Sequence, residues 1–177
     1  MKITVISYSY SGNNEALASS IANALGAEHL RISDSKTRSR STIFMDLIFN
    51  RTPMTNPSPE SIGDSNLVLF IGPVWVGQIA TPLRAYLNYF KTKSVPFAFI
   101  SISGGADGGN PKLGAELKRR IGKDPLIVLD FHIADLLPKI PKPKRQDTST
   151  YHLTESDVQF LTGEALKQLT EIMPNER

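Results

Sequence analysis

The sequence predicts a doubly wound α/β domain, with a five-stranded parallel sheet and helices on both of its faces. Short apolar blocks alternate with amphipathic stretches along the chain of 177 residues. The blocks carry β-branched residues on both sides of the pleat, which indicates strands that are covered on both faces. Each block is followed by a polar turn and a helix, as in right-handed crossovers between parallel strands. The length suits one domain, and we expect residues 1–177 to form it.

The first predicted strand covers residues 3–6. The helix after it ends at Gly26, a residue suited to a left-handed turn, and is expected to bury Leu17, Ile21, Ala24 and Leu25. Residues 28–32 alternate in polarity and form a shorter strand, and residues 67–71 form a buried one. The next helix is expected to open at Thr81 and Pro82, with the Thr81 hydroxyl as its cap, and to bury Leu83, Tyr86, Leu87 and Phe90.

Two more strands are predicted at residues 97–102 and 126–129. The helix between them starts at Asn110 and Pro111, stops at Gly122, and turns inward Leu113, Leu117 and Ile121. The last helix is capped by Thr154, has Asp157 in its first turn, and buries Val158, Leu161, Ala165, Leu169 and Ile172.

Two segments are irregular. Residues 33–64 contain a helix around residues 42–49 and then a proline-rich stretch, and the apolar cluster of that helix is either core or an interface in a homo-oligomer. Residues 138–150 are rich in proline and lysine and are expected to form a surface connection.

Composition excludes several classes of protein. The chain has no cysteine, which excludes thiolate metal sites, a cysteine nucleophile and a disulfide-built fold. Its net charge of +3 is too small to favour nucleic acid as a partner. The start lacks the pattern of a signal peptide, and no apolar run is long enough to span a membrane. We therefore expect a cytoplasmic protein without a metal.

The turn after the first strand is suited to an anion. Ligands of open α/β sheets bind beyond the carboxyl ends of the strands. There, hydroxyl and amide side chains surround a glycine directly before a helix, whose N-terminus presents unpaired N–H groups. Such a turn holds a terminal phosphate without Lys or Arg, and the alternative is an ordinary capped helix. The residues are Ser9, Tyr10, Ser11, Gly12, Asn13 and Asn14.

Two other turns at this edge are unusual. The turn after residues 67–71 holds the only tryptophan of the chain, between two glycines. This position favours stacking of the indole on a flat ligand over packing onto its own helix. The turn contains Pro73, Val74, Trp75, Val76, Gly77 and Gln78. The turn after residues 97–102 is glycine-rich, so its backbone can approach a ligand closely, unless it is merely mobile; it begins with Ser103, Gly104, Gly105 and Ala106.

Together the three turns resemble the flavodoxin family. Residues 9–14 are similar to the phosphate loop of that family, with Asn14 where Thr or Ser is usual, and residues 72–77 with 81–83 resemble the flavin edge of flavodoxin-like reductases. The resemblance implies strand order 2-1-3-4-5 and the cofactor FMN. It also implies that Ser9 and residues 11–14 take the phosphate, while residues 73–78 and 103–106 border the isoalloxazine.

The function predicted from this resemblance is an FMN-dependent oxidoreductase that passes electrons from NAD(P)H to a small acceptor such as a quinone. Residues 103–110 lack the second aromatic side chain that flavodoxin carriers place on the flavin, which leaves one face open. No side chain is assigned as a catalytic acid or base. The alternatives are an electron carrier that docks to a redox partner protein and a flavin-free binding or scaffold domain. The motifs of P-loop NTPases, Rossmann dehydrogenases and serine hydrolases are absent.

Overall fold

The computed structural model describes residues 1–34 and 39–173, and its centre is a five-stranded parallel sheet. The strands are β1 (Ile3–Ser7), β2 (Glu28–Arg31), β5 (Leu67–Ile71), β8 (Phe97–Ser103) and β9 (Val128–His132). Their order is β2-β1-β5-β8-β9 and every pair is parallel. This confirms the predicted order 2-1-3-4-5.

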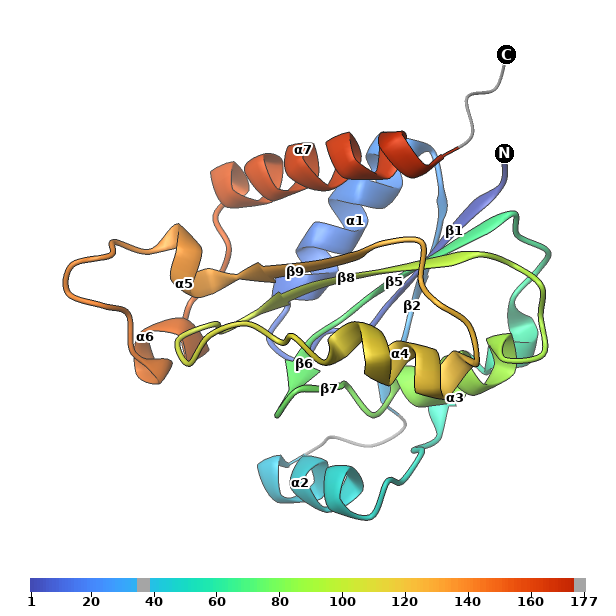
Figure 1. Cartoon of the computed structure of the whole chain (residues 1–177), viewed down its shortest axis with the longest axis horizontal. Coiled ribbons are helices and arrows are strands. Elements are labelled where there is room, and N and C mark those ends of the chain that lie inside the picture. The colour runs from blue at the N-terminus through green and yellow to red at the C-terminus, as the bar shows by residue number, and fades with distance from the viewer. Residues whose placement is uncertain (35–38, 174–177) are drawn as a thin grey trace.

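Two helices cover each face of the sheet (Figure 1). α1 (Asn13–Leu25) and α7 (Glu155–Ile172) lie on one face, and α3 (Leu83–Phe90) and α4 (Leu113–Ile121) lie on the other. β1 and β5 are buried at every position, because helices cover both of their faces. Both faces of the sheet are therefore core.

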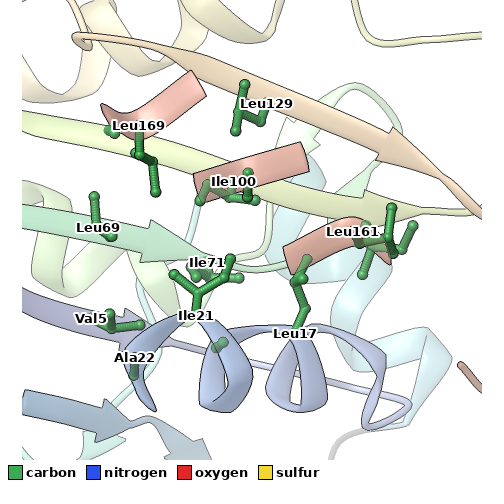
Figure 2. Packing of buried hydrophobic residues seen from close by; sticks show 14 of the residues in the cluster. Val5, Leu17, Ile21, Ala22, Leu69, Ile71, Ile100, Leu129, Leu161 and Leu169 are labelled. Atoms are coloured by element: carbon green, nitrogen blue, oxygen red, sulfur yellow. The ribbon is translucent and has the colours of Figure 1, made fainter. Parts of the chain in front are cut away.

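The core on the α1 and α7 side is purely aliphatic around the central strands. Figure 2 shows Leu17 and Ile21 of α1 and Leu161 of α7 meeting Ile71 and Ile100 of the sheet, and these five side chains are almost completely buried. Burying such a side chain contributes about 1.5–3 kcal/mol. This packing holds the carboxyl ends of β1, β5 and β8 at a fixed spacing.

The ends of the long helices follow the sequence signals. Gly26 and Gly122 end α1 and α4 with φ of 58° and 84°. Thr154 caps α7, since its Oγ1 accepts the N–H of Asp157 at 3.2 Å and the Asp157 carboxylate accepts the N–H of Thr154 at 2.8 Å. These three predictions are confirmed.

Four details differ from expectation. The fifth strand is Val128–His132, later than predicted, because the polar ends of this edge strand find partners in the loop after β8. Ala24 is exposed and Ala22 is buried in its place. α3 has Pro82 at its N-cap and no side-chain cap from Thr81. α4 begins at Leu113, after Lys112, rather than at Asn110.

The irregular segment 33–64 forms small elements outside the sheet; its residues 35–38 lie outside the described part of the chain. It holds β3 (Ser33–Asp34), α2 (Arg40–Ile48), β4 (Thr55–Asn56) and the 3-10 turn η1 (Pro59–Ser61). Of the apolar cluster on α2, Leu47 is buried, whereas Phe44, Ile48 and Phe49 are exposed. Most of the cluster is thus not core.

Two short helices lie between β9 and α7. They are α5 (Ile133–Leu136) and α6 (Arg145–Ser149), with a largely exposed connection between them (Figure 1). The segment 138–150 was predicted to be irregular throughout, and α6 corrects this prediction for residues 145–149. Among the described helices, none is both long and apolar enough to cross a bilayer.

Candidate functional site

The three predicted turns meet at the carboxyl edge of the sheet. They follow β1, β5 and β8, which are neighbours in the strand order, so parallel pairing brings their ends together. The turn after β5 forms a small hairpin of β6 (Val74–Trp75) and β7 (Gln78–Ile79), which projects from that edge near the start of α4 (Figure 1).

The turn of residues 9–14 leaves the N-terminus of α1 without a side-chain cap. Gly12 is the N-cap residue with φ of 92°, a left-handed conformation that favours glycine. The first intrahelical bond runs from the N–H of Ala16 to the Gly12 carbonyl. The N–H groups of Asn13, Asn14 and Glu15 therefore have no partner within the helix and carry the positive end of its dipole.

The side chains of this turn divide into two groups. The Ser11 side chain is exposed, whereas the Ser9 hydroxyl accepts the N–H of Gly12 at 3.0 Å. Asn13 and Asn14 are buried, and their amides bind backbone rather than facing a ligand. The Asn13 amide donates to the Tyr151 carbonyl at 2.8 Å and accepts the N–H of Leu153 at 3.0 Å.

Asn14 ties the turn to β8. Its Nδ2 donates to the Ile102 carbonyl at 2.9 Å, and its Oδ1 accepts the Ile102 N–H at 3.0 Å. Both halves of the amide bind Ile102 and the residue is almost completely buried, so the side chain that was expected to bind a phosphate is directed to β8 instead. In this arrangement Asn14 offers a phosphate only its backbone N–H.

Trp75 lies against the same turn. Its ring is half-buried and meets Tyr8 and Tyr10 edge to face, with ring centroids 5.9 and 6.3 Å apart. Tyr8 directly follows β1 and donates its hydroxyl hydrogen to Asp34 at 2.8 Å, while Tyr10 is 49% exposed. The structure thus brings the aromatic side chain beside the predicted anion turn.

The tip of the hairpin carries a strained residue. Val76 and Gly77 both have positive φ, 51° and 72°, as a two-residue hairpin turn of type I′ requires. Glycine adopts this conformation at no steric cost, but for β-branched valine it is an outlier. The Val76 side chain is 86% exposed, so packing does not explain the strain.

Buried charges hold β7 in place from the other side. The Ile79 N–H donates to Glu116 at 3.0 Å, and Glu116 pairs with Arg120 at 2.5 Å. Arg84 is fully buried and donates to Gln78 at 3.0 Å and to the carbonyls of Asp46 and Arg51. Burial, with the nearby Arg120 charge, lowers the pKa of Arg84 to about 10.

The glycine turn after β8 packs on His132. A Cβ on Gly105, whose φ is 73°, would lie 2.4 Å from the His132 Cβ, so only glycine fits there. His132 Nε2 is 3.0 Å from Asp130, whose carboxylate also accepts the N–H of Asn110 at 3.0 Å. The half-buried residues 103–106 therefore pack against the end of β9.

Sequence reasoning missed several of these residues. Arg84 stands three positions before Leu87, which places it on the inward side of α3, and this spacing was a usable signal. The buried roles of Asn13 and Asn14 had no local signal, since their partners are distant in the sequence.

Comparison with solved structures identifies the fold. A flavoprotein from Lactobacillus acidophilus NCFM in complex with FMN has a TM-score of 0.60 and 20% identity over 73% of this chain and 92% of its own. A flavoprotein from Bacteroides eggerthii has a TM-score of 0.63 and 16% identity over 84% and 93%. A flavodoxin from the domain Archaea has a TM-score of 0.51 and 13% identity over 97% and 99%.

The chain therefore has the flavodoxin-like fold. No protein-family model and no curated protein sequence matches it.

Proposed function

We propose that the protein binds FMN at residues 9–14, 73–78 and 103–106 and passes electrons from NAD(P)H to a small acceptor such as a quinone. The observation that supports this best is the contact between Trp75 and Tyr10. This contact places the Trp75 ring, which is suited to stacking, beside the N-terminus of α1, which is suited to phosphate. Both lie at the edge where flavodoxin-like folds hold ligands. One solved neighbour of this fold is described as a complex with FMN.

The residues of the first turn fit a phosphate ester. The N–H groups at the start of α1 and the exposed Ser11 hydroxyl are donors, and Gly12 has nothing within 4 Å of where a Cβ would be, so the approach is open. No Lys or Arg lies in residues 9–14. A neutral donor set suits a phosphate that is bound permanently and not transferred.

The other two turns fit a flat ring. Trp75 is held by its edge contacts with Tyr8 and Tyr10, which fix its plane before any ligand arrives. Residues 103–106 are half-buried and include two glycines, so their backbone N–H groups are donors with little side-chain bulk of their own. Bound FMN would supply the redox chemistry, and the protein would supply position, hydrogen bonds and exclusion of water.

The absence of an aromatic residue in positions 103–110 supports an enzyme over a carrier, because an open ring face admits a second flat substrate. In the overall reaction NAD(P)H gives up a hydride, and this hydride with one proton from solvent reduces a quinone to a hydroquinone. The donor is thereby oxidised to NAD(P)⁺, and atoms and electrons balance.

Steady-state oxidation of NADH and NADPH tests the proposal, with FMN-loaded protein, a soluble quinone, and free FMN as the blank. We expect consumption that rises with protein concentration. Bound FMN without consumption for any quinone would instead favour an electron carrier that docks to a partner protein. A protein that binds no FMN would be the flavin-free binding domain.

A further inference from the structure

A cavity adjoins the hairpin of β6 and β7. Its volume is about 600 Å³, within the range of small-molecule sites. It lies between the hairpin tip, residues 76–78, and the start of α4, where residues 109–112 and the side of the helix form the opposite wall. Residues 9–14 and 103–106 do not line it, so it shares only the hairpin tip with the proposed FMN site.

The wall formed by α4 carries an excess of positive charge. Lys112 and Arg119 both line the cavity and both side chains are exposed. Glu116 is the one carboxylate among the lining residues. Its two oxygens are engaged by the Arg120 guanidinium at 2.5 Å and the Ile79 N–H at 3.0 Å, and Arg119 is 3.8 Å away. The buried pair of Glu116 and Arg120 is neutral, which leaves two cations facing the cavity.

The neighbouring carboxylate of Asp130 does not offset these cations. It does not line the cavity itself. It accepts the backbone N–H and the side-chain amide of Asn110, a lining residue, both at 3.0 Å. The same oxygen, Oδ2, is 3.0 Å from His132 Nε2. Asp130 is thus engaged by Asn110 and His132 and is not among the residues that line the cavity.

We infer that this cavity binds the diphosphate of a dinucleotide electron donor, with Lys112 and Arg119 as its phosphate ligands. The inference rests on the proposed function. A neutral quinone carries no charge that could pair with two exposed cations. Guanidinium and ammonium groups bind phosphate oxygens by charge-assisted hydrogen bonds. Because the cavity and the proposed isoalloxazine edge share the hairpin tip, a donor whose diphosphate lies here can reach the ring with its nicotinamide.

The remaining lining suits the rest of such a donor. Pro111, Ala115 and Val76 give apolar contacts, and Gly77 and Gly109 leave backbone exposed without a side chain. A nucleoside diphosphate needs this combination of apolar wall for its rings and cations for its phosphates.

Calorimetric titration with ADP-ribose, which contains the diphosphate but no redox ring, tests the inference. We expect the FMN-loaded protein to bind it, the double variant Lys112→Ala/Arg119→Ala to bind it at least tenfold more weakly, and added salt to weaken binding to the wild type. Lys118→Ala is the matched control, because Lys118 is an exposed cation of α4 that pairs with Asp124 and lies outside the cavity. It should bind as the wild type does.

The affinity for FMN separates this inference from the proposed function. Equal ADP-ribose binding by the double variant would overturn the inference. So would a matching loss of FMN affinity, because the cavity would then belong to the FMN site. FMN binding without ADP-ribose binding overturns the inference alone, whereas ADP-ribose binding without FMN binding supports the cavity assignment and overturns the proposed function.

Discussion

The side-chain amide of Asn14 binds both backbone polar groups of Ile102, which lies 88 positions further along the sequence. Nδ2 donates to the carbonyl at 2.9 Å, and Oδ1 accepts the N–H at 3.0 Å. Asn14 lies in the first turn of α1, the helix that follows β1, and Ile102 lies near the end of β8. This pair crosses the carboxyl edge of the sheet and fixes the spacing between two of the three turns that form the candidate site. An amide does this where a hydroxyl would be too short to reach both groups.

Replacing this amide should cost folding stability. Asn14→Ala leaves the buried N–H and C=O of Ile102 without their partner, and we expect the free energy of unfolding to fall by about 2–4 kcal/mol. Urea denaturation measures this loss. Asn23→Ala on the exposed side of the same helix is the control and should change the value by less than about 0.5 kcal/mol. A similar small change for Asn14→Ala would show that the pair is not formed.

The hairpin tip should become more stable when its first residue tolerates positive φ. Asn is suited to the left-handed conformation that Val76 adopts, so Val76→Asn should raise the free energy of unfolding by about 1 kcal/mol. Gly77→Ala should lower it by about 1 kcal/mol, purely through the backbone, since nothing lies within 4 Å of the new Cβ. Thermal denaturation of both variants checks the predicted gain and the predicted loss of stability. A Val76→Asn variant less stable than the wild type would contradict the type I′ conformation of the hairpin tip.

Two glycines of the turn after β8 should respond differently to alanine. At Gly105 a Cβ would collide with His132 at 2.4 Å, so Gly105→Ala should lower the free energy of unfolding by about 2–4 kcal/mol. Gly108 also has positive φ, 104°, but open space around it, so Gly108→Ala should cost about 1 kcal/mol. Chemical denaturation compares them. Equal losses would mean that the contact between Gly105 and His132 is absent.

Stability should decrease in mild acid because of His29. Its Nε2 is 2.8 Å from the Ser7 hydroxyl, and burial first, then the Arg31 charge, lowers the pKa of His29 below 6.5. The unfolded chain then binds the proton more readily, so stability is complete above about pH 7 and falls as the pH drops through 6.5 toward the lowered value. His29→Gln should remove this dependence, while the exposed His152→Gln should retain it. A flat wild-type profile would refute the burial of His29.

The sequence predicted the parallel sheet because burial on both faces leaves a local pattern of β-branched residues, and glycines such as Gly26 and Gly122 mark helix ends locally. The strand order came from the resemblance to the flavodoxin family. The sequence did not predict the end of β9, where Asp130 and His132 find their partners in the turn after β8. On α2 the residues Ile43, Phe44, Leu47 and Ile48 share one side at helical spacing, yet only Leu47 is buried, which the spacing alone does not indicate.

The candidate site divides in the same way. The positions of its three turns follow from the strand order, and Trp75 was expected at the same edge of the sheet as residues 9–14. The contact of Trp75 with Tyr10 was not predicted. The sequence did not predict which side chains of the first turn face a ligand and which bind backbone. Asn13 and Asn14 have the side chains of ligand donors, but their partners lie 88 to 140 positions away.

Fluorescence of Trp75 during titration with FMN tests the central claim most directly, since Trp75 is the only tryptophan and reports on its own surroundings. We predict strong quenching that saturates at one FMN per chain. Ser11→Ala should shift the midpoint at least tenfold, because a hydrogen bond to a charged acceptor contributes about 1.5–3 kcal/mol, whereas Ser19→Ala, further along α1, should not. Trp75 emission that stays unchanged as FMN is added would contradict the account.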